Sequence, residues 1–522
     1  MNAAGLLVKC LEEEGIEYIF GVPGEENADF MMALEQSDKI RFVLTRHEQG
    51  AAFMAEVYGR LTGNPAGALG TLGPGATNLI TGVANANMDH APMLVLTGQG
   101  SVRRLHKESH QVMDVVGMFE PVTKWATSIR HPDTIPEVVR KAVRLARTEK
   151  PGAVHIELPE DIARLPTAKA PMAPRRYRRA VIDDKVADRA FALLRNAESP
   201  VILAGNGCVD MDADYCLYTI GLGTRDRISA AIEQSDLVIT LGFDMVEYHP
   251  ALWNPGRDKR IIHADFLPAE IDEHYHPEVE LIGDLAHTLW MLNERVAGAG
   301  DALRFDFSDQ RRLRGEMWAD VAEHADDDTE GFIRPQKALW DARQALGPHD
   351  VLLSDVGAHK MWIARHYHCH EPNTCLIPNG FCSMGFALPG AIAASMVLPD
   401  RRILAVCGDG GFLMNVQEME TARRLGVNFV ALVWEDGGYG LIAWKQDNEF
   451  DRHTDLAFGN PDWLKLAESF GWNGHRVDNS RDLRDTLEAA FNEPGPSLVV
   501  MPVDYRENQV LTRKLGLMTC KG

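Results

Sequence analysis

The chain has 522 residues and a formal net charge of −22, from 53 Lys and Arg against 75 Asp and Glu. This length exceeds the roughly 250 to 300 residues at which single hydrophobic cores stop growing, so we expect three domains. The negative charge repels phosphate backbones and anionic lipids, which argues against nucleic acid and membranes as partners. Eight cysteines without a CxxC pair, and a first segment without a signal-peptide pattern, favour a cytoplasmic protein.

The first third of the chain alternates short apolar runs with helical patterns. The runs are EYIFGVPG, RFVLTRHE, AGALGTLGPG and MLVLTGQG, and each is followed by an amphipathic stretch. This alternation predicts βα repetition and a parallel sheet flanked by helices. We place the first domain at 1–165, because the Pro- and Arg-rich stretch that continues to residue 181 lacks apolar periodicity and is typical of a linker.

Glu48 follows the second of these runs and opens a helical stretch of small residues. A carboxylate in a dry cleft has a raised pKa and can hold a proton for general acid–base chemistry. The more common explanation for such a residue is structural, because the helix dipole favours acids in the first turn. On the residues alone, both interpretations stay open.

The middle of the chain, 182–330, predicts a smaller α/β domain. Its strand-like runs are VILAGNG, DLVITLGF and RIIHADF, and a charged helical stretch follows around residues 310–325. The turn Gly205-Asn206-Gly207 falls short of the GxGxxG pattern, so a dinucleotide site has weak support.

The last third, 335–522, resumes the alternation with DVLLSDVG, RILAVCGDGG, NFVALVWEDGG and PSLVVMPVDY. These runs predict a second large parallel sheet. The first and last thirds are compatible with one shared architecture, although no fixed-period repeat is visible.

Two of these strands end in acidic, glycine-rich motifs, GDGG at 408–411 and EDGG at 435–438. Ligands of open parallel sheets bind beyond the carboxyl ends of strands, where glycines let the backbone approach a diphosphate. Asp409 and Asp436 would then serve as oxygen ligands of Mg²⁺, with the carbonyl of Gly438 as a third. Taken alone, the first motif is equally well explained as a strand-to-helix turn with a surface Asp.

Taken together, the two motifs resemble the signature of thiamine-diphosphate-dependent enzymes, which begins with Gly-Asp-Gly and closes with Asn-Asn or a variant. The likeness continues in FVLTRHEQGAAFMAEVYGRLTG around Glu48 and in PNGFCSMGFALPGAIAA, 378–394, and spans nearly the whole chain. It is nearest to acetolactate synthases, although Glu435 is an unusual residue in the closing pair. The resemblance implies a three-domain α/β fold with parallel sheets flanked by helices.

The same resemblance implies thiamine diphosphate and Mg²⁺ as cofactors. Glu48 would activate the cofactor through its aminopyrimidine, Met384 would hold the cofactor in its bent shape, and Gln111 would face the reacting carbon. The other implied cofactor contacts are Gly24, Asn78, Gly357, His359, Cys382, Gly408, Gly410, Gly411, Tyr439 and Gly440.

The implied activity is that of an acetolactate synthase-like transferase, which decarboxylates pyruvate and joins the hydroxyethyl unit to a second 2-oxo acid. No His-His pair lies near Gln111, which favours ligation over simple decarboxylation. Another thiamine-diphosphate decarboxylase or oxidase, or a non-catalytic paralogue, stays open as an alternative. The family implies a homodimer or homotetramer with active sites between subunits, and leaves a small regulatory subunit open.

Two departures from the family pattern limit the interpretation. After Gly205 the central domain lacks roughly 25 to 30 residues, through a natural deletion or a segment left out of the numbering. FAD, which the biosynthetic branch binds in this domain, therefore has weak support. Trp444 is followed by Lys445 where biosynthetic synthases have Gln, so the acceptor and a role in branched-chain amino acid biosynthesis stay open. The tight spacing of 367–370 (YHCH) argues against zinc.

Overall fold

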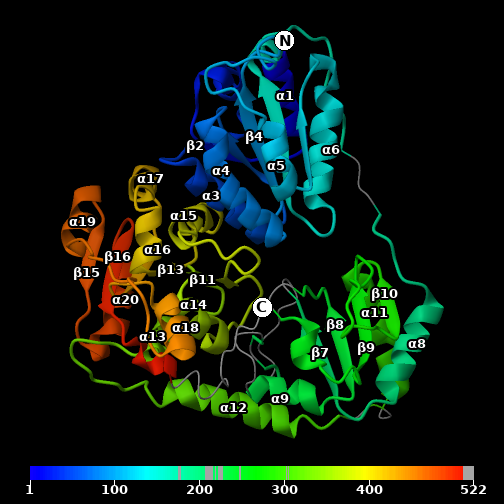
Figure 1. Ribbon diagram of the computed structural model, residues 1–522, viewed down its shortest axis with the longest axis vertical. Helices are drawn as coiled ribbons and strands as arrows, with labels where there is room; N and C mark the ends of the chain where they lie inside the picture. Colours follow the sequence, from blue (N-terminus) through cyan, green and yellow to red (C-terminus); the bar gives the residue numbers. More distant parts are fainter. Residues whose placement is uncertain are drawn as a thin grey trace.

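Three parallel sheets, each flanked by helices, make up the chain (Figure 1). The computed structural model describes residues 1–174, 178–205, 215–217, 219–220, 227–245, 248–300, 303 and 305–509. The predicted α/β class with parallel sheets is confirmed, because every strand pair within the three sheets is parallel.

The N-terminal sheet has six strands in the order β2-β1-β3-β4-β6-β5. Its strands are β1 (Tyr18–Gly21), β2 (Arg41–Leu44), β3 (Ala66–Gly70), β4 (Met93–Gln99), β5 (Trp125–Ser128) and β6 (Ala153–Pro159). Its helices are α1 (Ala3–Glu13), α2 (Ala28–Leu34), α3 (Glu48–Thr62), α4 (Pro74–Met88), α5 (Val115–Phe119), α6 (Ile135–Arg147) and α7 (Glu160–Ala163). β3, β4 and β6 are buried along their whole length, as expected for strands covered on both faces.

The central sheet is smaller, with four strands in the order β10-β9-β8-β7. Its strands are β7 (Pro200–Ala204), β8 (Leu237–Leu241), β9 (Arg260–Asp265) and β10 (Val279–Ile282). Its helices are α8 (Asp184–Arg195), α9 (Arg227–Gln234), α10 (Pro250–Trp253), α11 (Leu285–Ala299) and α12 (Ser308–Ala322). Asn206 and Gly207 of the predicted turn, and most of the segment where we infer missing residues, lie outside the described residues.

The C-terminal sheet has six strands in the order β12-β11-β13-β14-β16-β15, which repeats the strand order of the N-terminal sheet. Its strands are β11 (Val351–Ser354), β12 (Cys375–Leu376), β13 (Ile403–Gly408), β14 (Val430–Glu435), β15 (Asn473–Arg476) and β16 (Ser497–Pro502). Its helices are α13 (Pro335–Ala345), α14 (Ala358–His366), α15 (Ala387–Val397), α16 (Asp409–Met414), α17 (Glu418–Leu425), α18 (Gly440–Phe450), α19 (Trp463–Phe470) and α20 (Leu483–Asn492). The two outer thirds therefore share one architecture.

One continuous hydrophobic core lies between the two large sheets and contains residues of α3, α4, α15 and α17. Small residues let these helices approach closely: a Cβ atom on Gly82 of α4 would lie only 2.5 Å from Cβ of Ala52 of α3. The rings of Phe53 and Phe386 meet edge to face, 5.7 Å apart, and join α3 to the start of α15. The two large domains are thus packed together within one chain.

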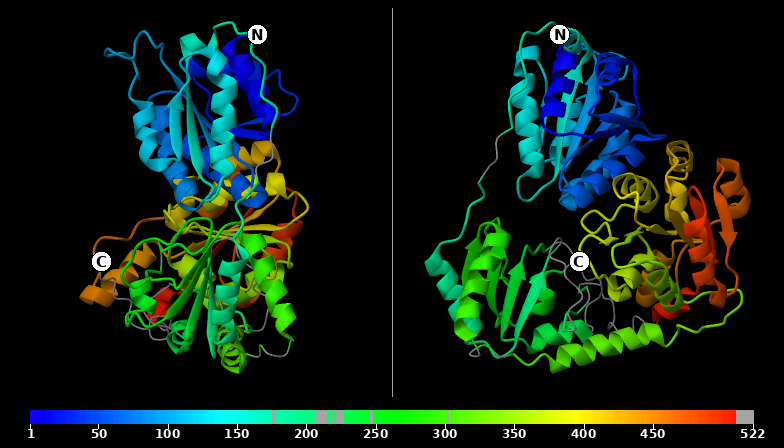
Figure 2. Two further views of the ribbon diagram at one scale, coloured as in Figure 1. Left: turned by 90° about the vertical axis from the view of Figure 1, so that its right-hand side faces the viewer. Right: turned by 180° about the vertical axis from the view of Figure 1, so that it is seen from behind.

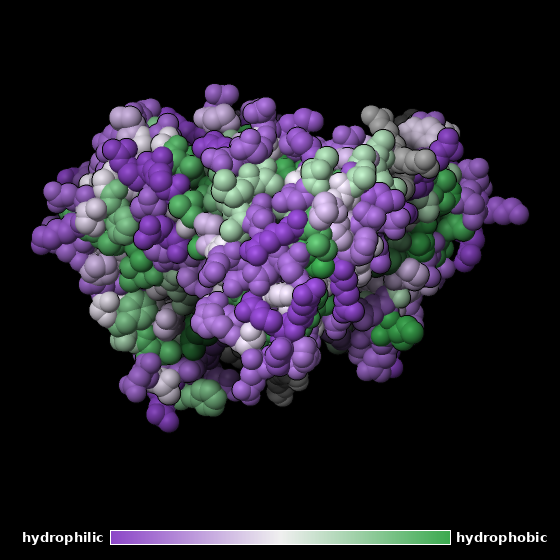
Figure 3. Space-filling model, turned by 90° about the horizontal axis from the view of Figure 1, so that it is seen from above, coloured by the Kyte–Doolittle hydropathy of each residue, from purple (hydrophilic) through white to green (hydrophobic). Residues whose placement is uncertain are grey.

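The segment after α7 runs along the outside of the molecule to the central domain (Figure 2). Its described residues, 164–174 and 178–183, form neither helix nor strand. Seen from the end that carries the N-terminal domain, the surface is largely hydrophilic, with hydrophobic residues in separate groups (Figure 3). In the described part of the chain, no helix has the length and apolar character needed to cross a membrane.

Candidate active site

The two strands that end in acidic motifs are neighbours in the C-terminal sheet. β13 and β14 run side by side with Gly408 opposite Trp434, so Asp409 and Asp436 both lie at the carboxyl edge. Oδ2 of Asp409 accepts hydrogen bonds from the backbone N–H groups of Gly437 (2.7 Å) and Asp436 (3.2 Å). The structure therefore brings the two predicted metal ligands together.

The electrostatics of this acid pair suit a bound cation. Burial of its carboxyl group, followed by the charge of Asp409, raises the pKa of Asp436 to about 7. Asp436 is nevertheless an exposed residue, so solvent screens part of this effect. No group of three or more His, Cys, Asp and Glu side chains among the described residues could hold a metal. Two neighbouring carboxylates fit Mg²⁺, which uses one or two carboxylates beside phosphate and backbone oxygens.

The loop after β14 packs tightly against the acid pair, at positions where glycine has no side chain to collide with its neighbours. A Cβ atom on Gly440 would lie 2.4 Å from Oδ2 of Asp436, and one on Gly410 would lie 3.1 Å from the ring of Tyr439. Gly438 forms an isolated antiparallel bridge with Ala457, which holds this loop in place. Only glycine therefore fits at position 440, because any side chain there would collide with the carboxylate of Asp436.

His359, at the start of α14, lies between two glycine turns. Cβ atoms on Gly357 and Gly408 would approach its ring to 2.8 and 3.3 Å. The imidazole is 1% exposed, and its Nε2 atom has no hydrogen-bond partner among the described residues. Burial lowers the pKa of His359 to about 4, so the ring is neutral near pH 7. A buried polar atom without a partner is rare in folded proteins, so Nε2 marks a place where a bound ligand or water molecule would supply one.

Asp355 connects this turn to the segment that contains Met384. Its carboxylate accepts hydrogen bonds from the backbone N–H groups of Val356 (2.7 Å) and Gly385 (2.9 Å). A Cβ atom on Gly411 would lie 3.2 Å from the same carboxylate. Asp355 therefore joins the predicted diphosphate turns to the segment of the half-buried Met384.

Cys382 adopts a left-handed backbone conformation, with φ of 57°. Its Sγ donates to the carbonyl of Asn379 (3.0 Å) and accepts from Nζ of Lys360 (3.2 Å). Left-handed conformations of residues other than glycine cost about 1 kcal/mol or more and cluster at functional sites. The strained turn is next to Met384, where the sequence predicts cofactor contacts.

Glu48 is the first residue of α3, as predicted, and is 7% exposed. Its Oε2 accepts a hydrogen bond from Nδ2 of Asn78 on α4 (3.0 Å). A Cβ atom on Gly75 would lie 3.3 Å from its other carboxylate oxygen. The structure thus groups two predicted site residues, Glu48 and Asn78, at the carboxyl edge of the N-terminal sheet.

Two further predicted residues lie on neighbouring turns of the N-terminal domain. The backbone N–H of Gly24 donates to Oδ1 of Asn27 (2.8 Å). Gln111 is exposed, with φ of 56°, and a Cβ atom on Gly73 would lie 2.9 Å from its Cβ. Gln111 therefore lies beside the turn that begins α4, the helix that carries Asn78.

Glu418, which the sequence analysis did not single out, holds the turn before Glu48. This glutamate of α17 is fully buried. Its Oε1 accepts from the backbone N–H groups of Arg46 (3.1 Å) and His47 (3.0 Å), and its Oε2 accepts from Oγ1 of Thr421 (2.6 Å). The C-terminal domain thus fixes the approach to Glu48.

The N-terminal domain holds the Cys382 segment in the same way. Oδ1 of Asp89 accepts from the backbone N–H groups of Asn379 (3.0 Å) and Gly380 (2.8 Å). Oδ1 of Asn85 accepts from the backbone N–H of Ser383 (3.1 Å). Asn85 of α4 and Asp89, which directly follows this helix, are buried and were also absent from the sequence-based prediction.

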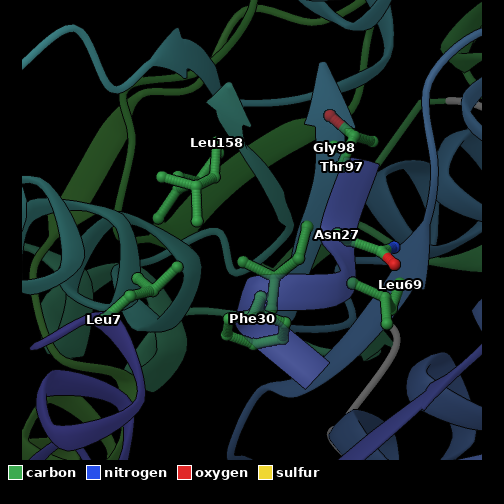
Figure 4. A pocket seen from close by; sticks show the side chains of 9 residues that line it. Leu7, Asn27, Phe30, Leu69, Thr97, Gly98 and Leu158 are labelled. Atoms are coloured by element: carbon green, nitrogen blue, oxygen red, sulfur yellow. The ribbon is translucent and has the colours of Figure 1, made fainter. Parts of the chain in front are cut away.

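A small apolar cavity lies in the N-terminal domain, where Leu7, Phe30 and Leu158 surround it (Figure 4). Its polar lining includes Asn27 and Thr97. None of the described residues that line it is a predicted site residue, so the cavity is separate from the acid pair.

Sequence models of known families match each of the three domains. The N-terminal and C-terminal thiamine pyrophosphate-binding domains of thiamine pyrophosphate enzymes match residues 1–118 and 355–501. The central domain of the same enzymes matches residues 206–292.

Curated relatives align along almost the whole chain. The acetolactate synthase of Bacillus subtilis is 34% identical, over 97% of this chain and 94% of its own length. The catabolic acetolactate synthase of Raoultella terrigena is 34% identical, over 99% and 97%. The large subunit of acetolactate synthase isozyme 1 of Escherichia coli is 29% identical, over 97% and 94%.

Proposed function

Because the chain belongs to the thiamine pyrophosphate enzyme family, with acetolactate synthases among its relatives, we propose that it joins two 2-oxo acids with loss of CO₂. Pyruvate would be the donor, and the product would be an acetohydroxy acid. The observation that carries the proposal is the buried Glu48 paired with Asn78, on a chain that also carries Asp409 and Asp436 at neighbouring strand ends. Cofactor activation and metal binding each need one of these pairs.

The C-terminal domain would bind the diphosphate end of the cofactor. Asp409, Asp436 and the carbonyl of Gly438 would hold Mg²⁺, which would offset the charges of both acids and of the diphosphate. The backbone N–H groups around Gly357 would receive phosphoryl oxygens, next to the unpartnered Nε2 of His359. No global attraction helps the anionic substrate, because the net charge is −22, so these local groups must supply it.

Glu48 would hold a proton against N1′ of the aminopyrimidine. Its low exposure of 7% suits this role, because the aminopyrimidine would meet the carboxyl group away from bulk water. Asn78 keeps the carboxylate in place by donating to Oε2. When bound, thiamine diphosphate supplies the nucleophilic carbon and the electron sink for decarboxylation. Met384 and Cys382 would support the pyrimidine, and Gln111 would face the acceptor.

We propose that two copies of the chain share each active site. The hydrogen bond between Glu48 and Asn78 lies within one N-terminal domain. The carboxyl group of Glu48 would contact a cofactor whose diphosphate is bound at the metal site of a second chain. A mixture of Glu48→Gln and Asp436→Ala chains tests this sharing. Each variant alone would be inactive, while mixed dimers would have one intact site and regain up to about half the activity per dimer. No recovery in verified mixed dimers would refute a shared site.

The decisive assay supplies purified protein with thiamine diphosphate, Mg²⁺ and pyruvate, and measures acetolactate after acid conversion to acetoin. Oxygen uptake is recorded in parallel. Acetolactate formed without oxygen uptake would support the proposed carboligation. Oxygen uptake with a yellow protein would instead indicate a flavin-dependent oxidase, and cofactor binding without any turnover of pyruvate would contradict pyruvate as the donor.

A further inference from the structure

Glu435 is the residue of the closing pair that departs from the family signature, and its carboxylate has three donors. Oε1 accepts from Nε1 of Trp463 (2.6 Å) and Nδ2 of Asn460 (3.3 Å), and Oε2 accepts from a guanidinium nitrogen of Arg476 (2.9 Å). Glu435 is therefore bound to α19, to the turn before it and to β15. It is adjacent in sequence to Asp436, yet its oxygens are occupied elsewhere.

Asn460 connects Glu435 to the acid pair. Its Nδ2 also donates to Oδ2 of Asp409 at 2.8 Å, so one amide group bridges the two carboxylates. Because both partners are acceptors, the orientation of the amide is determined by its contacts. The Oδ1 atom of Asn460 is buried and has no hydrogen-bond partner among the described residues. It is an acceptor that a water molecule carried by a cation would satisfy.

The donors on Asp409 are distributed unequally between its oxygens. Oδ2 accepts from Asn460 and from the N–H groups of Asp436 and Gly437, whereas Oδ1 accepts from the N–H of Gly410 (2.8 Å). Oδ1 therefore keeps the larger capacity for another ligand. A carboxylate fixed in this way needs no further ordering when a cation binds.

Arg476 explains why an acid is tolerated at position 435. Its guanidinium pairs with Glu435 (2.9 Å) and, on its other side, with Asp478 (2.9 Å). The positive charge offsets the carboxylate of Glu435, which limits repulsion with Asp409 and Asp436. An Asn at this position would need no such cation.

We propose that Glu435 and Asn460 are positioning residues of the metal site, with Glu435 holding the amide of Asn460 and Asn460 fixing Asp409 for Mg²⁺. The proposal rests on the proposed function, because it assumes that Asp409 binds the cation. It concerns residues that touch neither substrate nor cofactor, so they would act through the geometry of Asp409.

The test measures Mg²⁺ affinity in the presence of saturating thiamine diphosphate, by calorimetry, with Mn²⁺ and electron paramagnetic resonance as a second probe. Asn460→Ala should weaken cation binding about 10- to 100-fold, the usual range when an outer partner of a metal ligand is lost. Glu435→Gln should weaken it less, because the amide oxygen still accepts from Asn460. The melting temperature without cation shows whether each variant is folded, and if Asn460→Ala is not, Glu435→Gln carries the test.

Asp478→Asn is the matched control, because it removes the same charge from Arg476 without touching Asn460. It should bind Mg²⁺ like the unaltered protein. If Asp478→Asn and Glu435→Gln lowered the Mg²⁺ affinity equally, the effect would be one of net charge and the proposal would be wrong. Unchanged Mg²⁺ affinity in folded Asn460→Ala would also overturn it. If the unaltered protein bound neither Mg²⁺ nor thiamine diphosphate, the proposed function itself would fail.

Discussion

The role of Glu418 leads to a prediction about a residue that lies outside the cofactor cleft. Its carboxylate accepts two backbone N–H bonds from the turn before Glu48 and a hydroxyl bond from Thr421. Hydrogen bonds to charged groups contribute about 1.5 to 3 kcal/mol each. Glu418→Gln leaves one carbonyl oxygen for the two amides, and the Thr421 hydroxyl can turn to accept from the new amide nitrogen, but both amide bonds lose the charge of their acceptor, so we expect a loss of about 2 kcal/mol in stability.

The larger effect should be on the activation of the cofactor. A displacement of about 1 Å in a reacting group costs on the order of 100-fold in rate, so we expect proton exchange at C2 of bound thiamine diphosphate to slow about 10- to 100-fold. Exchange into deuterated solvent, quenched with acid and followed by NMR, measures this rate directly. Binding of Mg²⁺ and thiamine diphosphate should be unchanged, because the variant does not alter the C-terminal cleft.

Thr421→Val is the control for this experiment. It removes the hydroxyl donor at 2.6 Å but leaves the bonds from the Arg46 and His47 amides. It should lower stability by about 1 kcal/mol and leave the exchange rate within about twofold. Normal exchange in Glu418→Gln, or equally slow exchange in both variants, would refute the assigned role.

Three further changes test the individual site residues. Glu48→Gln should abolish C2 exchange while cofactor binding persists; normal exchange in an NMR assay would move the activating acid elsewhere. Asp436→Ala should weaken the Mg²⁺-dependent binding of thiamine diphosphate at least about 10-fold, as measured by fluorescence titration, whereas equal affinity would relocate the metal. Burial lowers the pKa of His359 to about 4 in the folded protein, from an ordinary value of 6.5. Between these two values the unfolded state binds more protons, so the protein loses stability as the pH is lowered. From pH 7 to 5 this amounts to about 2 kcal/mol, and urea unfolding of the cofactor-free protein should show a smaller loss in His359→Asn.

The strands that could be predicted from the sequence are those that consist of apolar residues. β3, β4, β13 and β14 consist of runs buried on both faces, and each was visible in the sequence. β15, with the sequence NGHR, has no apolar run, because it lies at the edge of its sheet beside β16. The strand order that the two large sheets share could not be predicted from the sequence, because no residue pattern repeats between the two domains.

The acid pair could be predicted because both members follow strands in the same sequence motif. Asn460 could not, since it lies 51 residues beyond Asp409 in a turn with no apolar periodicity, and only folding brings the two side chains within 2.8 Å. Glu418 could not be predicted either, although it lies in a segment with a clear helical pattern. It lies in a helical stretch where a glutamate is ordinary, and the contacts that distinguish it are made with residues 371 and 372 positions away.

Within one chain, the turn before Glu48 and the segment before Cys382 are each held by the other large domain. Glu418 of the C-terminal domain satisfies the amides that precede Glu48, and Asp89 of the N-terminal domain satisfies amides just before Cys382. Both acids are buried and act on backbone groups, so sequence changes in the turns themselves would leave the bonds in place. The geometry of both turns is therefore set by Glu418 of α17 and by Asp89, which directly follows α4, rather than by the turns themselves. A change in either helix should alter cofactor activation before it alters cofactor binding, because it moves the catalytic turns while the diphosphate end stays fixed by Asp355.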